Sequence, residues 1–454
     1  MEKTDPHLRP TSEIAIHRHD NRDRRLVTRA WPWLCGLAGL LAAFPAACED
    51  GALRANRVVA SPTFKAATRS LDDGYSRVVD DIVALTEIPA PPFGERLRAE
   101  AFLSRLREAG LGDAAIDAEG NVIGLRPGAR TKGRGPYIVV AAHLDTVFPQ
   151  GVDVKVRREG TRLMAPGVGD DTKSLAVILA YVRALQAAHV QTDADILFVG
   201  DVGEEGPGNL RGVRYLFEKG PYAGKIAAFI SIDLVDPNLV VDRAVGSKRY
   251  HAVFHGPGGH SYASFGIVNP MAAMSRAVVD LYDLKPPSTP KATYSASVTG
   301  GGVSVNSIPG EVFMDFDLRS ENPAELARLD GQLRSILQGA VAAENSARST
   351  ANGGVSVQLS SIGDRPAGAT PAGSDIVLAT DGAIRALGFI PEHQSDSTDA
   401  NIPMSLGIPA VTIGSGGAGA RAHALDEWID IEKSSNVRGM AVGLAVLLAM
   451  AGSR

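Results

Sequence analysis

Short apolar runs typical of buried parallel strands recur along this chain, and helical patterns separate them. The runs are YIVVAAHLD (137–145), ADILFVGD (194–201), IAAFISIDL (226–234) and, far downstream, IPAVTIGSG (408–416). Between the first two, TKSLAVILAYVRALQAA (172–188) places its leucines and isoleucines on one helical face. Strands that alternate with helices in this way predict an α/β fold, a sheet with helices on both faces.

A second pattern occupies residues 246–362. Here KRYHAVFHG (248–256) and EVFMDFDLR (311–319) alternate like half-exposed strands, and helical stretches near 270–284 and 323–343 separate such runs. We expect a small α+β domain inserted into the larger one, whose two parts span 70–245 and 363–454. The closing helix, VRGMAVGLAVLLAMAG (437–452), is long and apolar, but its interspersed glycines favour packing against the sheet over crossing a membrane.

Residues 1–48 read as a basic leader and signal peptide. Seven Lys/Arg precede the uncharged run AWPWLCGLAGLLAAFPAAC (30–48). This pattern predicts export to the periplasm or secretion, while an uncleaved membrane anchor or lipid attachment at Cys48 are the alternatives. The only cysteines, Cys35 and Cys48, both lie in this segment, so a chain cleaved after it has no thiolate ligand or disulfide. A net charge of −5 excludes the basic bias of nucleic-acid-binding proteins.

Acidic and histidine side chains follow the apolar runs. Ligands of open α/β sheets bind at the carboxyl ends of strands. Carboxylates gathered there would repel one another without cations, and histidine with carboxylates is a donor set that suits zinc, so two divalent ions would resolve the repulsion. Each residue also has a structural interpretation, as a helix cap, a solvated loop or a strand end. The candidates are His143, Asp145, Asp171, Glu204, Glu205 and Asp233.

The order H-x-D, D-x-K, E-E, a strand-terminal D and a later H resembles the di-zinc metallopeptidase family of acetylornithine deacetylase, succinyl-diaminopimelate desuccinylase, peptidase T, aminoacylase and glutamate carboxypeptidase, with a peptidase-T-like loop at DSTDAN (396–401). The motifs are AAHLDTVFP (141–149), GVGDDTKSLA (167–176), GEEG (203–206) and AHALDEWID (422–430). The resemblance implies a zinc-peptidase-type catalytic domain with a mixed sheet and an inserted ferredoxin-like dimerisation domain. It further implies two zinc ions, with cobalt or manganese as alternatives, held by His143, Asp171, Glu205, Asp233 and His423.

Roles for further residues also come from the resemblance. Asp145 is expected to orient His143, and Glu204 to act as general base. Aligning on the lysine of D-x-K selects Asp171 over Asp170 as the ligand that bridges the metals. In GPGGHSYASFG (256–266), His260 corresponds to a histidine that reaches the active site of a partner subunit, although an ordinary turn explains this stretch as well. Arg319 and Asn306 match positions that contact substrate.

The function expected from these residues is zinc-dependent hydrolysis of amide bonds in short peptides, with Glu204 as the base for a metal-activated water. The metal ligands do not separate this activity from deacylation of N-acyl amino acids, which stays the alternative. A non-catalytic binding protein on the same scaffold is a weaker rival, because every expected ligand and the base are present. The chain has no G-x-S-x-G, which argues against a serine hydrolase of that type.

Overall fold

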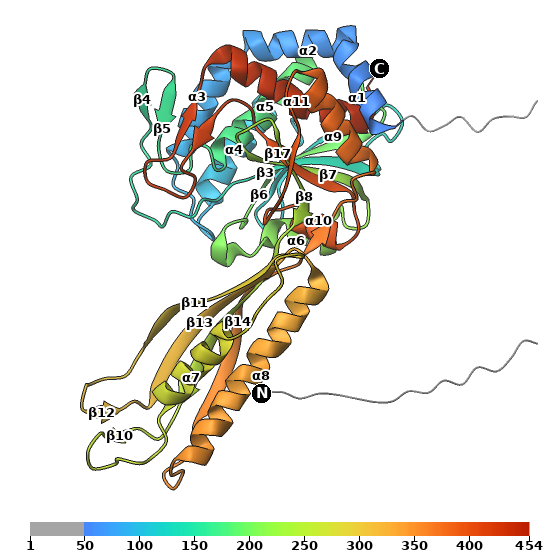
Figure 1. Ribbon diagram of the computed structural model, residues 1–454. Coiled ribbons are helices and arrows are strands. Elements are labelled where there is room, and N and C mark those ends of the chain that lie inside the picture. The colour runs from blue at the N-terminus through green and yellow to red at the C-terminus, as the bar shows by residue number, and fades with distance from the viewer. Residues whose placement is uncertain (1–49, 454) are drawn as a thin grey trace, which may run out of the picture. The chain divides into compact units, whose positions relative to one another are not determined.

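The computed structural model describes residues 50–453 (Figure 1). The leader and signal peptide expected over residues 1–48 lie outside the described residues, and so do both cysteines. The signal peptide and its alternatives therefore stay predictions.

The largest element is a mixed sheet in the order β1-β2-β6-β3-β7-β17-β8-β15, with β16 pairing alongside β8. The central strands β6, β3, β7 and β17 run parallel, whereas β1, β2, β8 and β15 join their neighbours antiparallel. The strands are β1 (Ala115–Ile116), β2 (Val122–Arg126), β3 (Tyr137–His143), β6 (Asp195–Asp201), β7 (Ile226–Leu234), β8 (Leu239–Ala244), β15 (Gly368–Ala369), β16 (Glu392–Asp396) and β17 (Ala410–Gly414).

Alternate residues of β3 enter two separate cores, which shows that helices cover both faces of the sheet, as predicted. Ile138 and Val140 pack into the larger core and Val139 and Ala141 into the smaller one. The larger core receives α1 (Gly51–Ala60), α2 (Pro62–Asp73), α3 (Tyr75–Thr86), α4 (Arg96–Glu108), α5 (Thr172–Ala187), α9 (Asp375–Ala386) and α11 (Lys433–Ala451). The smaller core receives α6 (Arg211–Glu218) and α10 (Asn401–Ser405).

The closing helix α11 is a core element. By length and composition it is the one helix of residues 50–453 that could cross a membrane, but 78% of its apolar window is buried in the protein. Its side chains pack beside α9, α1 and α2, and Tyr181 of α5 donates a hydrogen bond to the carbonyl of Met440. The preference for core packing is confirmed.

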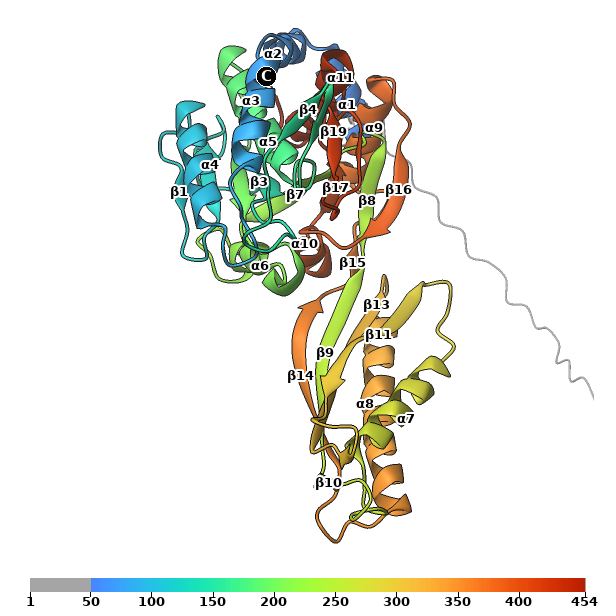
Figure 2. The ribbon, with the colours of Figure 1, turned by 90° about the vertical axis from the view of Figure 1, so that its left-hand side faces the viewer.

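A second, four-stranded antiparallel sheet follows β8 in the chain, in the order β11-β13-β9-β14 (Figure 2). Two helices pack on one of its faces around a core of its own that includes Phe254, Phe316 and Leu333. The succession β-α-β-β-α-β is that of a ferredoxin-like fold, as expected. Its elements are β9 (Gly246–His255), β10 (Gly259–His260), α7 (Pro270–Tyr282), β11 (Ala292–Gly301), β12 (Ser307–Ile308), β13 (Glu311–Ser320), α8 (Pro323–Ala347) and β14 (Ser356–Arg365).

A small third sheet joins segments that lie far apart in the sequence. Its order is β18-β19-β5-β4, and Trp428 pairs with Met164 across more than half of the chain's length. This pairing places the loop after β5 beside the loop between β18 and β19. The strands are β4 (Arg157–Glu159), β5 (Arg162–Met164), β18 (Gly419–Ala420) and β19 (Trp428–Asp430).

Candidate metal centre

His143 is the last residue of β3 and is completely buried. Its Nδ1–H donates a hydrogen bond to the backbone carbonyl of Asp145 at 3.0 Å. This bond fixes the imidazole tautomer and leaves Nε2 as the nitrogen available to a ligand. Nε2 lies 3.0 Å from Asp170 Oδ1 and 3.4 Å from Asp233 Oδ1, so carboxylates from two other segments face it.

Asp145 also organises the loop that carries the two adjacent glutamates. Its Oδ1 accepts the N–H groups of Gly203 and Glu204 at 3.0 Å, and its Oδ2 accepts that of Glu205 at 2.9 Å. The sequence interpretation assigned Asp145 to orienting His143. The structure gives that contact chiefly to its backbone carbonyl, since the carboxylate lies 3.6 Å from Nδ1. The carboxylate instead fixes where Glu204 and Glu205 point.

The carboxylate that lies between the two histidines belongs to Asp170, the alternative to Asp171 as the bridging ligand. Asp170 Oδ1 is 3.0 Å from His143 Nε2, and its Oδ2 is 3.1 Å from His423 Nε2. Asp171 instead contacts the backbone of His143, whose N–H it accepts through Oδ2 at 3.0 Å. Lys173, the lysine of D-x-K, donates to the carbonyl of Gly416, outside this cluster.

The remaining expected ligands converge on the same place. Glu205 Oε1 lies 3.0 Å from His423 Nε2. Asp233 belongs to β7, whose carboxyl end lies beside that of β3 because the two strands are parallel neighbours. His423 sits in the β18–β19 loop with a left-handed backbone φ of 66°, and its side chain is 55% exposed. The centre is therefore closed on the side of the sheet and open on the side of His423.

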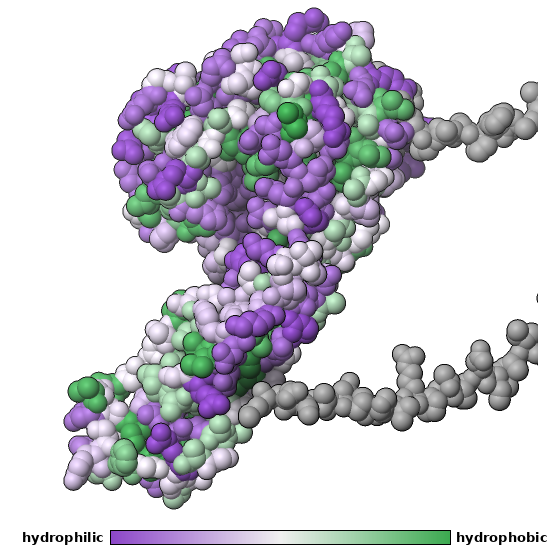
Figure 3. Space-filling model, viewed as in Figure 1, coloured by the Kyte–Doolittle hydropathy of each residue, from purple (hydrophilic) through white to green (hydrophobic). Residues whose placement is uncertain are grey.

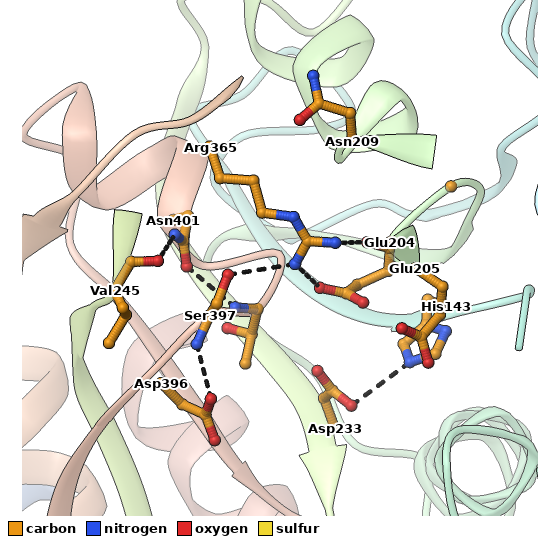
Figure 4. A network of polar contacts seen from close by, with 12 residues as sticks. His143, Glu204, Glu205, Asn209, Asp233, Val245, Arg365, Asp396, Ser397 and Asn401 are labelled. Atoms are coloured by element: carbon orange, nitrogen blue, oxygen red, sulfur yellow. Dashed lines mark hydrogen bonds and ion pairs between the residues drawn. The ribbon is translucent and has the colours of Figure 1, made fainter. Parts of the chain in front are cut away.

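Glu204 differs from its neighbour in having an arginine as its partner (Figure 4). Arg365, the last residue of β14, donates from Nη1 to Glu204 Oε1 at 2.8 Å and from Nη2 to the backbone carbonyl of Glu204. Both side chains are buried, with 5% and 6% of their surfaces exposed. The pair ties the glutamate loop to the four-stranded sheet.

Burial and mutual repulsion shift the ionisation of this cluster. Burial, with a contribution from Glu205, raises the pKa of Glu204 to about 8, although Arg365 acts in the opposite direction. Burial also raises the pKa of Asp233 to about 7, against the effect of His143. Hydrogen bonds to Asp170 and Glu205 raise the pKa of His423 to about 11. Carboxylates held in this way favour a neutralising cation.

The donor set fits divalent metal ions. Two groups of ligand atoms, each within 4.8 Å of one another, share His143: one includes Asp170 and Glu205, the other Asp171 and Asp233. Asp171 Oδ1 is buried and has no hydrogen-bond partner among the described residues. Imidazole nitrogens and carboxylate oxygens suit zinc and other first-row divalent ions.

A cavity of about 590 Å³ opens beside the centre. Arg319, one of the expected substrate contacts, lines it together with Glu204 and His423. Among residues 50–453, which the structure describes, the lining of this cavity does not include His260 or Asn306. They lie on and beside the β10–β12 pair, and His260 Nδ1 accepts a backbone N–H from Tyr262 at 3.2 Å.

Two residues that the sequence interpretation missed support the centre. Arg365 was missed because it lies outside every motif and is not adjacent to one in the sequence. Glu427 is buried, and its carboxylate accepts N–H groups from Gly167, Gly169 and Asp170 at 2.7 to 2.8 Å. It therefore fixes the loop that presents Asp170. Its position within AHALDEWID was the available signal, since it follows His423 by four residues.

The family model for peptidase family M20/M25/M40 matches residues 139–451. The chain belongs to this family. A segment of 122 residues is 36% identical to a protein of Pyrococcus abyssi described as a hydrolase of LysW-lysine and LysW-ornithine, covering 27% of this chain and 32% of that protein. Among solved structures, aminopeptidase PepT from Bacillus cereus has a TM-score of 0.66 at 19% identity, covering 83% of this chain and 99% of PepT.

A further solved structure, the YXEP protein of Bacillus subtilis, is described as a dinuclear metal-binding peptidase of the same family. It has a TM-score of 0.58 at 18% identity and covers 83% of this chain and 99% of its own. These likenesses show a shared fold. The family match alone places this chain among the hydrolases of peptide or amide bonds.

Proposed function

We propose that this chain is a dinuclear metal-dependent peptidase that cleaves short peptides, with Glu204 as its general base. The observation that carries the proposal is the division between the two adjacent glutamates. Glu205 faces His423 and belongs to a group of candidate metal ligands, whereas Glu204 is outside both groups and pairs with Arg365. A carboxylate beside a metal centre and free of it is suited to carrying a proton.

Two zinc ions per chain are proposed, with cobalt or manganese as alternatives. His143 and Asp233 would hold one ion, Glu205 and His423 the other, and Asp170 would bridge them, with Asp171 beside the first. Bound divalent ions supply Lewis acidity, which polarises a carbonyl and lowers the pKa of water. The YXEP protein, described as dinuclear, supports the count of two.

The residues of this chain then divide the work of hydrolysis. Glu204 removes a proton from the attacking water as the new C–O bond forms, and it returns that proton to the leaving nitrogen as the C–N bond breaks. Arg365 holds the Glu204 carboxylate in place throughout. Arg319, with its planar fork, would bind a carboxylate of the substrate. His260 and Asn306 would contact substrate from a partner subunit, because they do not line the cavity of their own chain.

The choice of short peptides follows the fold of PepT, an aminopeptidase, and deacylation of N-acyl amino acids remains the second candidate. The Pyrococcus abyssi relative, described as a hydrolase of LysW-lysine and LysW-ornithine, is consistent with either. The proposed form is a homodimer, exported by its N-terminal segment to the periplasm or beyond, with no nucleic-acid partner.

The test of the proposal is Glu204→Gln. We expect about 100- to 10,000-fold lower kcat on a dipeptide that the wild type cleaves, because the amide cannot accept the proton. Bound metal, measured by elemental analysis, should stay at the wild-type amount, since Glu204 is not a ligand. Glu218→Gln on the exposed side of α6 is the matched control. Wild-type turnover in Glu204→Gln would remove Glu204 from the role of base.

A further inference from the structure

The four-stranded sheet forms one wall of the cavity. This wall carries three arginines, which lie in two adjacent rows that run across the strands. Arg319, Ser247 and Arg365 lie opposite one another on β13, β9 and β14, and Asp317, Arg249 and Gly363 form the next row on the same face. Arg249, Arg319 and Arg365 all line the cavity. The acidic ligands line its other part, so the cavity is negative at the metal centre and positive at the sheet.

Two of these arginines share a single carboxylate. Arg249 Nε lies 3.1 Å from Asp317 Oδ1, and Arg319 Nε lies 2.7 Å from Asp317 Oδ2. Within residues 50–453, the terminal nitrogens Nη1 and Nη2 of Arg249 and Arg319 have no hydrogen-bond partner. With Arg365 bound to Glu204 of the glutamate loop, the three guanidiniums of this wall pair with two carboxylates, those of Asp317 and Glu204. The terminal forks of Arg249 and Arg319 are therefore held in place and still open to an anion.

Small residues in the two rows make room for this arrangement. Gly363 lies beneath the side chain of Arg249, and a Cβ at this position would be 3.1 Å from Arg249 Cδ. Ser247, between Arg319 and Arg365, is fully buried, and its hydroxyl has no hydrogen-bond partner among the described residues. Burial lowers the pKa of Arg249, and repulsion from the nearby Arg365 adds to that shift. An anionic ligand would relieve that repulsion.

We propose that Arg249 and Arg319 form a double anion site. It selects substrates whose carboxyl-terminal residue is aspartate or glutamate, because such a residue presents two carboxylates to the four-stranded sheet. Each open guanidinium fork matches one carboxylate in bidentate geometry. Arg319 takes one group and Arg249 the other, while the scissile amide lies toward Glu204. This inference rests on the proposed function and narrows its substrate class.

The experiment compares substrates that differ only in the charge of the terminal side chain: Ala-Glu against Ala-Gln, and N-acetyl-Glu against N-acetyl-Gln. For the series that the wild-type enzyme cleaves, we expect kcat/KM to favour the glutamate member by about 10- to 100-fold, the discrimination typical of a charged hydrogen bond. The preference should appear mainly in KM. Equal rates on both members would overturn the double site.

Variants locate the preference. Arg249→Gln should reduce the glutamate-to-glutamine ratio to about one, and Arg276→Gln, an exposed arginine of α7, should leave the ratio at its wild-type value. Gly363→Ala displaces Arg249 without removing charge and should reduce the ratio by a smaller factor. A ratio that survives both changes contradicts the role of Arg249. Absence of hydrolysis of all four substrates by metal-loaded wild type would instead count against the proposed function itself.

Discussion

At Asp170 and Asp171, adjacent carboxylates have different partners. Asp170 contacts the side chains of both His143 and His423, whereas Asp171 accepts the backbone N–H of His143. In the proposed centre, replacing Asp170 would weaken the binding of both ions, whereas replacing Asp171 would weaken chiefly the binding of the ion beside His143. The two positions can therefore be separated by metal content alone.

Asp170→Asn should weaken binding of both metal ions by at least about tenfold, because an amide supplies no charge to a bridging position. Asp171→Asn should weaken chiefly the ion held by His143. Metal content after dialysis against graded chelator measures both effects, with Asp280→Asn, a partly exposed residue of α7, as the control. If Asp171→Asn loses both ions while Asp170→Asn keeps them, the original choice of Asp171 was correct.

Side chains that belong to motifs with a recognisable spacing could be predicted from the sequence. Side chains whose role depends on a backbone contact or on a residue far away in the sequence could not. His143, Glu204, Glu205, Asp233 and His423 follow strands or stand in motifs, and the structure brings them together. Arg365 reaches Glu204 across 161 positions of sequence. Nothing in the residues around Arg365 encodes that contact, because it depends on how β14 ends beside the glutamate loop.

At the scale of elements, long strands were predictable and short ones were not. The apolar run of β3 is buried at every position, and such a run has few other structural explanations. The strands β4, β5, β18 and β19 are two or three residues long, and Leu163 and Ile429 are their only buried residues. The pairs β4–β5 and β18–β19 are local, but β5 and β19 pair across more than 250 residues, which periodicity does not report.

This small sheet matters because Glu427, just before β19, holds the loop of Asp170. Burial, with a contribution from Asp170, raises the pKa of Glu427 from 4.5 to about 7. When folding raises the pKa of a carboxyl, its contribution to the free energy of unfolding is fully present below about pH 4.5. That contribution is lost as the pH rises through about 7. The loss amounts to roughly 3 kcal/mol for a shift of this size.

Glu427→Gln removes that titration. In chelator-treated protein, we expect the free energy of unfolding of the wild type to fall more steeply between pH 5 and 7.5 than that of the variant, by roughly 3 kcal/mol over the range. Urea unfolding at several pH values measures both curves. Glu100→Gln, on exposed α4, should follow the wild type. Parallel curves for wild type and Glu427→Gln would show that this carboxyl does not titrate as described.

At the scale of the whole molecule, large apolar side chains are exposed at the end of the four-stranded domain where β10 and β12 lie (Figure 3). Tyr262, Phe265, Val303 and Val305 are each at least 85% exposed. This end of the sheet is opposite the row of Arg365, because β9 runs from Ser247 there to His255 here. Exposed apolar patches mark contact surfaces, and His260 lies within this one.

If a second copy covers this surface, Val305→Asp combined with Val303→Asp should convert a dimer into a monomer, because burying two carboxylates against an apolar partner costs several kcal/mol. Light scattering coupled to size exclusion measures the mass. Activity should fall with the mass, since His260 then has no partner cavity to enter. Ile390→Asp, at an apolar and exposed position of the larger domain, should keep both mass and activity. A monomeric variant with wild-type kcat would show that each chain hydrolyses its substrate without His260 of a partner.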